Sequence, residues 1–231
     1  MRIKQSCFLL KLNGKYIWIE PYGIPENMQK ADIILITHGH FDHNARTATK
    51  HILKDTTTII YPKKVGRIRR RWKRKANTIG IEPFEEIKIE GIHIQGFPMY
   101  NTDGLLWGLI KFHRKKKDLC GYIISNEKHK IYHAGDTDVI PEMKKLRKKN
   151  LDFALLPIGG TFTMNPEAAI RATKFIHPKI MIPMHNRMKE LDEFKKQFTS
   201  EISDIEILSL QPGECISDKN WDEKQYYCED F

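Results

Sequence analysis

The chain has 231 residues, of which 40% are hydrophobic and 29% charged, and its formal net charge is +10. This length suits one domain with a substantial core, and we expect a single domain over residues 1–231. No run of 18 apolar residues occurs and the first residues lack a secretory apolar stretch, so we expect no membrane span and a cytoplasmic protein. The positive charge favours anionic partners without identifying one.

The cysteines are widely separated and form no Cys-x-x-Cys pair. They are Cys7, Cys120, Cys215 and Cys228. We therefore expect reduced thiols, with neither a cysteine zinc site nor a disulfide framework.

The N-terminal third predicts strands alternating with helices. A hairpin is expected because Asn13-Gly14, which favours a type I′ turn, separates two apolar-rich runs at 7–12 and 15–19. The short apolar run at 33–36 predicts a buried strand. Further along, a helix at 44–53, a strand at 57–61 and a helix at 64–76 are expected; in the last, Val65, Ile68, Trp72 and Ala76 share one face.

The rest of the chain predicts a meander of strands followed by mixed elements. Strands are expected at 87–89, 92–97, 105–112, 121–125, 130–132, 153–156, 180–183 and 205–210. Helices are expected at 140–149, 166–176 and 190–198, the second capped by Asn165 with Pro166 at its first position. This order predicts two sheets with helices packed outside them.

A dense cluster of metal-binding side chains follows the strand predicted at 33–36. His38, His40, Asp42 and His43 lie within six residues. Imidazole and carboxylate groups are ligands for divalent metals, and this run supplies enough of them for two ions that share a water. The sequence therefore predicts a metalloenzyme.

Two later segments also place a polar side chain just after an apolar strand. Asp136 follows the small-residue turn Ala134-Gly135, and His185 follows the strand predicted at 180–183. If these strand ends converge, Asp136 and His185 complete the metal site.

With these residues in place, the chain resembles metallo-β-lactamase-fold hydrolases. The His38-x-His40-x-Asp42-His43 motif, the Gly135-Asp136-Thr137 turn and His185 occur in the order typical of that superfamily. The segments 135–138, 156–160, 164–169 and 182–185 resemble the branch of L-ascorbate-6-phosphate lactonase-like proteins. The resemblance implies an α/β (α+β) fold, a four-layer αββα sandwich with metals at one edge of the two sheets.

The resemblance also implies a division of ligands between two metals. His38 and His40 would hold the first metal, Asp42, His43 and His185 the second, and Asp136 would bridge them. One or two divalent ions per chain are expected, with zinc first and manganese or iron as alternatives. Asp42 is also the candidate catalytic base, because it would lie beside the metal-bound water.

One expected ligand is missing. The superfamily usually supplies a third histidine to the first metal from the segment that here reads 96–101, which contains none. Asn101 could offer an amide oxygen instead, His113 could reach in from the next strand, or the enzyme could hold only the second metal. Candidate substrate-binding residues are Tyr100, Asn101, His113, Thr163 and Asn186.

A basic stretch gives a second possible partner. Nine of the thirteen residues from Lys63 to Lys75 are lysine or arginine. Such a run can bind phosphates, but a solvated helix face is the slightly favoured explanation.

Three functions therefore stand side by side. The leading one is a hydrolase for a small anionic ester, lactone or phosphodiester. The others are a metal-dependent nuclease guided by the basic stretch, and a nucleic-acid-binding or scaffolding protein with a decayed site. A membrane partner is not expected, and a homo-oligomer is left open.

Overall fold

The computed structural model describes residues 1–102, 113–186 and 191–217, so the strand expected at 105–112 lies outside the described residues. The described chain divides into two compact units. The first unit comprises Met1–Tyr61, Val65–Gly80 and residues 210–217, and the second comprises Pro62–Lys64 and Ile81–Ser209. The two units are described separately below.

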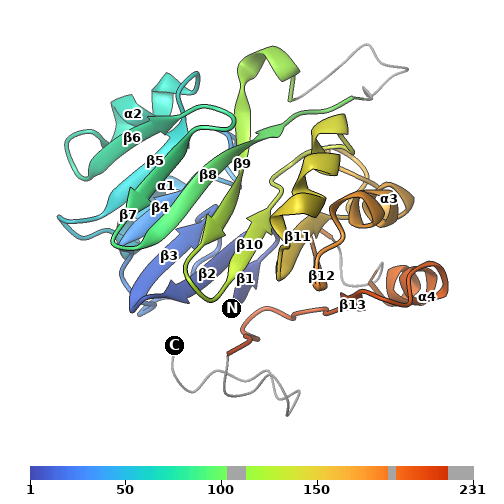
Figure 1. Ribbon diagram of the computed structural model, residues 1–231. Coiled ribbons are helices and arrows are strands. Elements are labelled where there is room, and N and C mark those ends of the chain that lie inside the picture. The colour runs from blue at the N-terminus through green and yellow to red at the C-terminus, as the bar shows by residue number, and fades with distance from the viewer. Residues whose placement is uncertain (103–112, 187–190, 218–231) are drawn as a thin grey trace. The chain divides into compact units, whose positions relative to one another are not determined.

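A six-stranded sheet forms the frame of the first unit, in the order β1-β2-β3-β4-β5-β6 (Figure 1). Its strands are β1 (Arg2–Lys4), β2 (Cys7–Leu12), β3 (Lys15–Ile19), β4 (Ile33–Leu35), β5 (Thr58–Pro62) and β6 (Asn77–Ile81). The predicted hairpin is confirmed: β2 and β3 pair antiparallel, and Asn13 and Gly14 both have positive φ. The strand β6 was not predicted, because Asn77-Thr78 and Gly80 dilute its apolar pattern.

Two short helices cover one face of this sheet. They are α1 (Arg46–Ile52) and α2 (Gly66–Trp72), both shorter than the sequence predicted. Ile52 of α1 and Ile68 and Trp72 of α2 belong to one buried cluster with Trp18 and Ile34 of the sheet. This burial explains the shared apolar face of α2, and the chain beyond Trp72 forms turns instead of further helix.

A seven-stranded sheet forms the frame of the second unit, in the order β13-β12-β11-β10-β9-β8-β7. Its strands are β7 (Glu86–Ile89), β8 (Ile92–Met99), β9 (Leu119–Ser125), β10 (Lys130–His133), β11 (Phe153–Pro157), β12 (Ile180–Met184) and β13 (Glu206–Ile207). The strands β7 to β10 form the predicted antiparallel meander, and β10 to β13 run parallel.

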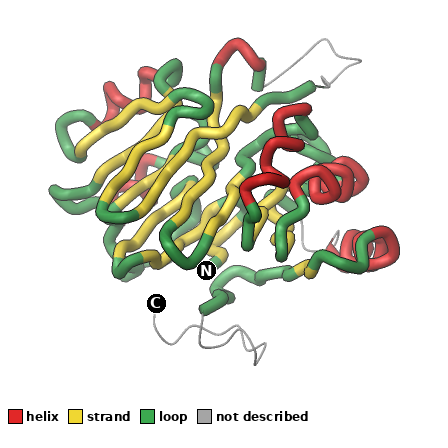
Figure 2. Tube along the Cα trace, viewed as in Figure 1, coloured by secondary structure: helices red, strands yellow, loops and turns green. Residues whose placement is uncertain are grey.

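Helical segments of the second unit gather beside its parallel strands, as the colours of Figure 2 show. They are η2 (Pro141–Lys149), α3 (Pro166–Ile176) and α4 (Leu191–Glu201), whereas the short η1 (Lys115–Lys117) precedes the antiparallel strand β9. The cap of α3 is as predicted, because Asn165 accepts a hydrogen bond from the Ala168 amide at 2.8 Å. The expected helix at 140–149 is a 3₁₀ helix, η2.

Mixed sheets and helices confirm the predicted α/β class. No helix among the described residues is long and apolar enough to cross a membrane. Cys7 and Cys120 are free and buried, as expected, but Cys215 is disulfide-bonded, which the cysteine spacing did not reveal.

Candidate metal centre

The first group of candidate ligands follows two neighbouring strands of the first unit. β3 and β4 run parallel, so the segments after them leave the sheet at one edge. His38, His40, Asp42 and His43 follow β4, and Glu20 follows β3 directly. The fold therefore adds a buried carboxylate that the sequence analysis did not select.

A relay of polar groups orients His38. The Thr37 hydroxyl donates to Glu20 Oε1, and its oxygen lies 2.8 Å from His38 Nδ1. Since the hydroxyl proton goes to Glu20, Nδ1 of His38 is the donor to Thr37, and the lone pair of His38 is on Nε2. That Nε2 lies 3.1 Å from Nδ1 of His40.

Glu20 also orients His43. Its Oε2 lies 2.7 Å from Nδ1 of His43, and both side chains are fully buried. A carboxylate at this position favours the tautomer with the proton on Nδ1, so Nε2 of His43 carries the lone pair. Nε2 is 3.5 Å from Oδ2 of Asp42.

Asp42 is ionised at neutral pH. Burial by itself raises the pKa of this carboxyl, but hydrogen bonding and charge from His43 when that ring is protonated, together with the Gln5 amide 3.0 Å away, lower the pKa to about 2. An ionised carboxylate is a ligand that divalent cations accept.

These spacings fit a divalent metal. Two nitrogens bound to one tetrahedral zinc at about 2.0–2.1 Å stand roughly 3.3 Å apart. The His38–His40 and His43–Asp42 separations of 3.1 and 3.5 Å bracket that value. In addition, Glu20, His38 and His43 bring ligand atoms within 4.8 Å of one another.

The second group of candidate ligands follows parallel strands of the second unit. β10 and β12 both pair with β11 in parallel, so their carboxyl ends share an edge. Asp136 follows β10 and His185 follows β12, and Oδ2 of Asp136 lies 3.3 Å from Nε2 of His185. This pair also has the spacing of ligands that share an ion.

His185 is held tightly by the backbone after β11. It adopts a left-handed conformation with φ of 52°. A Cβ added at Gly159 would overlap the His185 carbonyl, so only glycine permits this approach. The Leu156-Pro157-Ile158-Gly159-Gly160 segment therefore fixes the position of His185.

Asn101 and His113 are joined to each other. The backbone N–H of Asn101 donates to the His113 carbonyl at 2.8 Å. The backbone N–H of His113 donates to the side-chain Oδ1 of Asn101 at 3.0 Å. Nδ2 of Asn101 donates to Oδ1 of Asp138 at 3.3 Å and to the Phe162 carbonyl at 3.0 Å. The carboxamide thus holds three chain segments together, and the His113 side chain is buried beside them.

The other candidate substrate-binding residues have local contacts. The Tyr100 hydroxyl donates to Glu142 at 2.7 Å, and the Lys115 ammonium lies 4.8 Å from the centre of the Tyr100 ring. Thr163 is buried and donates to the Met164 carbonyl, while Asn186, directly after His185, is partly exposed.

The sequence analysis missed the supporting residues of both groups. Glu20 had a usable signal, because it directly follows an apolar strand, as the histidine cluster does. Asp138, two residues after Asp136, accepts from Thr102 as well as Asn101. These contacts span 17 to 37 residues, which local spacing cannot predict.

Comparison with known families places this geometry in context. The model of the beta-lactamase superfamily domain matches residues 2–185, which include all six candidate ligands. A UPF0173 metal-dependent hydrolase of Thermococcus onnurineus is 32% identical over 227 residues, 89% of this chain and 93% of the relative. A second, from Methanopyrus kandleri, is 29% identical over 229 residues, 90% of this chain and 95% of the relative.

Solved structures show the same fold. A putative metal-dependent hydrolase from Parabacteroides distasonis has a TM-score of 0.75 and 29% identity, covering 91% of this chain and 92% of its own. The metallo hydrolase Igni18 from Ignicoccus hospitalis has a TM-score of 0.73 and 25% identity, covering 93% and 95%.

Proposed function

Because the chain belongs to the beta-lactamase superfamily and is a metal-dependent hydrolase, we propose that it hydrolyses an anionic ester, lactone or phosphodiester. The observation that carries the proposal is the pair of imidazoles at 3.1 Å, His38 and His40, in which Thr37 and Glu20 set the metal-binding nitrogen of His38. Such a pair, beside an ionised Asp42, supplies the nitrogen and oxygen ligands that bind a divalent cation.

We assign the ligands as follows. His38, His40, Asp42 and His43 would hold a divalent metal in the first unit, and Asp136 and His185 would hold one in the second. Zinc fits nitrogen and oxygen donors at these spacings, and manganese or iron fit the same donors. A divalent metal lowers the pKa of a bound water and so supplies hydroxide at neutral pH.

The protein's own side chains orient the donors and hold protons in place. Glu20 keeps the Nδ1 proton on His43 and, through Thr37, on His38. Asp42, which accepts from the Gln5 amide at 3.0 Å, is a ligand in this proposal and also the candidate catalytic base.

An anionic substrate is consistent with the charge. The chain carries 39 basic against 29 acidic side chains, which raises the local concentration of anions around it. A lactone with a phosphate group and a phosphodiester both meet this condition, because each carries a negatively charged phosphate group.

Metal content and hydrolysis test the proposal together. We expect one to two equivalents of metal in the purified protein, and a loss of about one equivalent in His38→Ala. His93→Ala is the matched control, because His93 lies on the surface and pairs only with Glu86 among the described residues. The protein should hydrolyse bis-p-nitrophenyl phosphate or a phosphorylated lactone, and a metal-free wild type without either activity would overturn the proposal.

A further inference from the structure

We propose that the first unit binds single-stranded nucleic acid through α2 and the loop that carries the histidine cluster. Phosphates would contact a basic surface, and a base would stack on Phe41. The basic surface consists of Arg67, Arg70, Arg71, Lys73, Arg74 and Lys75. The inference rests on the proposed function, because it makes the hydrolysed group a phosphodiester of a strand.

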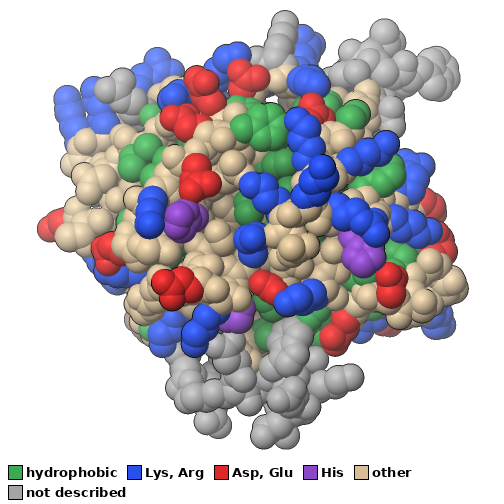
Figure 3. Space-filling model, in the orientation of Figure 1, with side chains coloured by type: hydrophobic (Ala, Val, Ile, Leu, Met, Phe, Trp, Pro, Cys, Tyr) green, Lys and Arg blue, Asp and Glu red, His purple; other side chains and the backbone are tan. Residues whose placement is uncertain are grey.

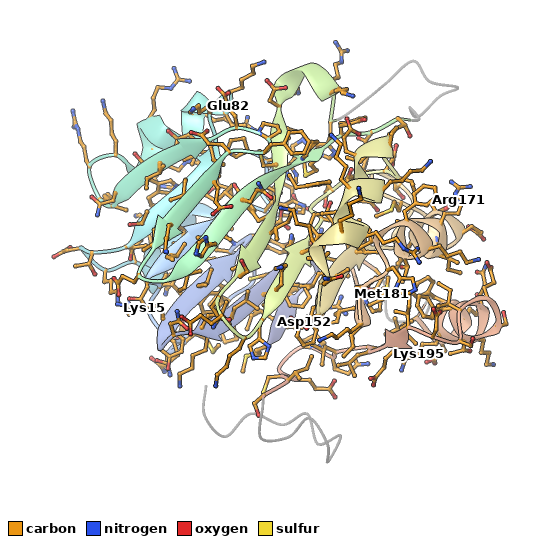
Figure 4. The ribbon with its side chains drawn as sticks, viewed as in Figure 1. Lys15, Glu82, Asp152, Arg171, Met181 and Lys195 are labelled. Carbon is orange, nitrogen blue, oxygen red and sulfur yellow. The ribbon has the colours of Figure 1, made fainter. Side chains whose placement is uncertain are left out.

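Burial of one helix face directs the basic surface outward. Ile68 and Trp72 are buried in the core of the first unit, whereas the six basic residues are exposed. Lysine and arginine side chains gather over α2 at the upper left of Figure 3, and Figure 4 shows long side chains extending from this helix into solvent. The surface is therefore accessible to a large anion.

Acidic side chains do not neutralise this surface. In the described part of the chain, none of the six basic residues forms an ion pair with a carboxylate, whereas the neighbouring Lys63 pairs with Glu82 and Glu85. A chain of phosphates releases its condensed counterions when unpaired cations along a short helix neutralise it, which favours a polymer over a single phosphate group.

Two arginines connect the basic surface to the ligand loop. Arg67 donates to the Gly39 carbonyl, and Arg71 donates to the Asn44 carbonyl at 3.3 Å. A Cβ at Gly39 would overlap the Arg67 guanidinium, so this glycine permits the contact. The two arginines therefore bracket residues 40–43, and a strand bound at α2 runs beside the candidate metal ligands of the same unit.

Phe41 supplies the aromatic platform. Its side chain is 76% exposed, compared with 48% for Phe84 and 39% for Phe162. An edge-type contact with Tyr22, at 6.2 Å between ring centres, supports the ring. An exposed aromatic ring next to a row of cations is the usual composition of a single-strand site, because bases stack on the ring while phosphates follow the cations.

Fluorescence anisotropy with labelled oligonucleotides tests the inference. Phosphorothioate strands, which resist hydrolysis, keep binding separate from the proposed reaction. We expect Phe41→Ala to weaken single-strand binding at least about fivefold while leaving duplex binding unchanged, because duplex bases are not exposed for stacking. Phe41→Trp should restore binding.

A charge-reversed pair tests the phosphate contacts. The double variant Arg70→Glu, Arg74→Glu should weaken binding. It should also reduce the slope of log K against log[salt] by about 0.7 for each lost phosphate contact. The matched control, Lys148→Glu with Lys149→Glu, makes the same charge change on the exposed η2 of the second unit and should leave binding within about twofold.

Specific results would overturn the inference. It is wrong if the control pair weakens binding as much as the α2 pair, if Phe41→Ala has no effect on single strands, or if only anionic vesicles bind. Strand binding by a metal-free protein that hydrolyses neither bis-p-nitrophenyl phosphate nor a phosphorylated lactone would support this surface and contradict the proposed function, so the two failures are distinguishable.

Discussion

At the residue scale, Glu20 is the side chain whose role depends most on the fold. It directly follows β3, is completely buried, and contacts both Thr37 and His43. A carboxylate that fixes the tautomer of a metal-binding histidine raises the basicity of that ligand. The predicted ligands His38 and His43 thus depend on a residue 17 or more positions away in the chain.

We expect Glu20→Gln to lower metal affinity about 10–100-fold, because the amide no longer holds the proton on His43 Nδ1. Competition with a chromophoric chelator measures the affinity. Glu86→Gln is a closely matched control, since Glu86 contacts His93 at the same 2.7 Å, but on the surface. Equal metal affinity in wild type and Glu20→Gln would contradict the role assigned to Glu20.

At the element scale, parallel strand ends determine which loops meet. β3 and β4 bring Glu20 to the histidine cluster in the first unit, and β10, β11 and β12 bring Asp136, Gly159 and His185 to one edge in the second. Charged side chains hold the opposite ends of such strands. Just before β11, Asp152 (labelled in Figure 4) accepts a hydrogen bond from the Lys130 backbone N–H and forms an ion pair with Lys179.

The start of α3 gives a prediction at this scale. Asn165 caps the helix that follows the Gly159-Gly160 turn, so Asn165→Ala should lower the free energy of unfolding by about 1 kcal/mol. Asn165→Asp, which keeps a side-chain acceptor, should retain most of that stability. Urea denaturation followed by circular dichroism measures both, and equal losses in the two variants would show that the cap contributes nothing.

At the scale of the whole molecule, burial couples stability to pH. The Cys7 thiol is buried, and burial raises its pKa from 9.0 to about 12. Below pH 9 the thiol is protonated in both states; between about pH 9 and 12 the unfolded chain loses this proton while the folded chain keeps it. Stability therefore falls as pH rises through this range, by about 1.4 kcal/mol per pH unit.

Cys7→Ala tests this coupling. The variant loses some packing at every pH, but its stability should fall less steeply between pH 9 and 10.5 than that of the wild type. Urea unfolding at pH 8.5, 9.5 and 10.5 gives the slopes. Parallel slopes for the two proteins would mean that Cys7 does not titrate differently in the folded and unfolded states.

The amino-acid sequence by itself determined the family, the α/β class and the order of the candidate ligands. Hairpin turns, buried strands and the His38–His43 motif are contiguous in the chain, so composition and spacing predict them. Only the tertiary structure brought Glu20 to His43, joined Asn101 to Asp138, and connected α2 to Gly39. Those contacts link distant segments, and local sequence cannot specify them because strand pairing and burial, not spacing, decide which side chains meet.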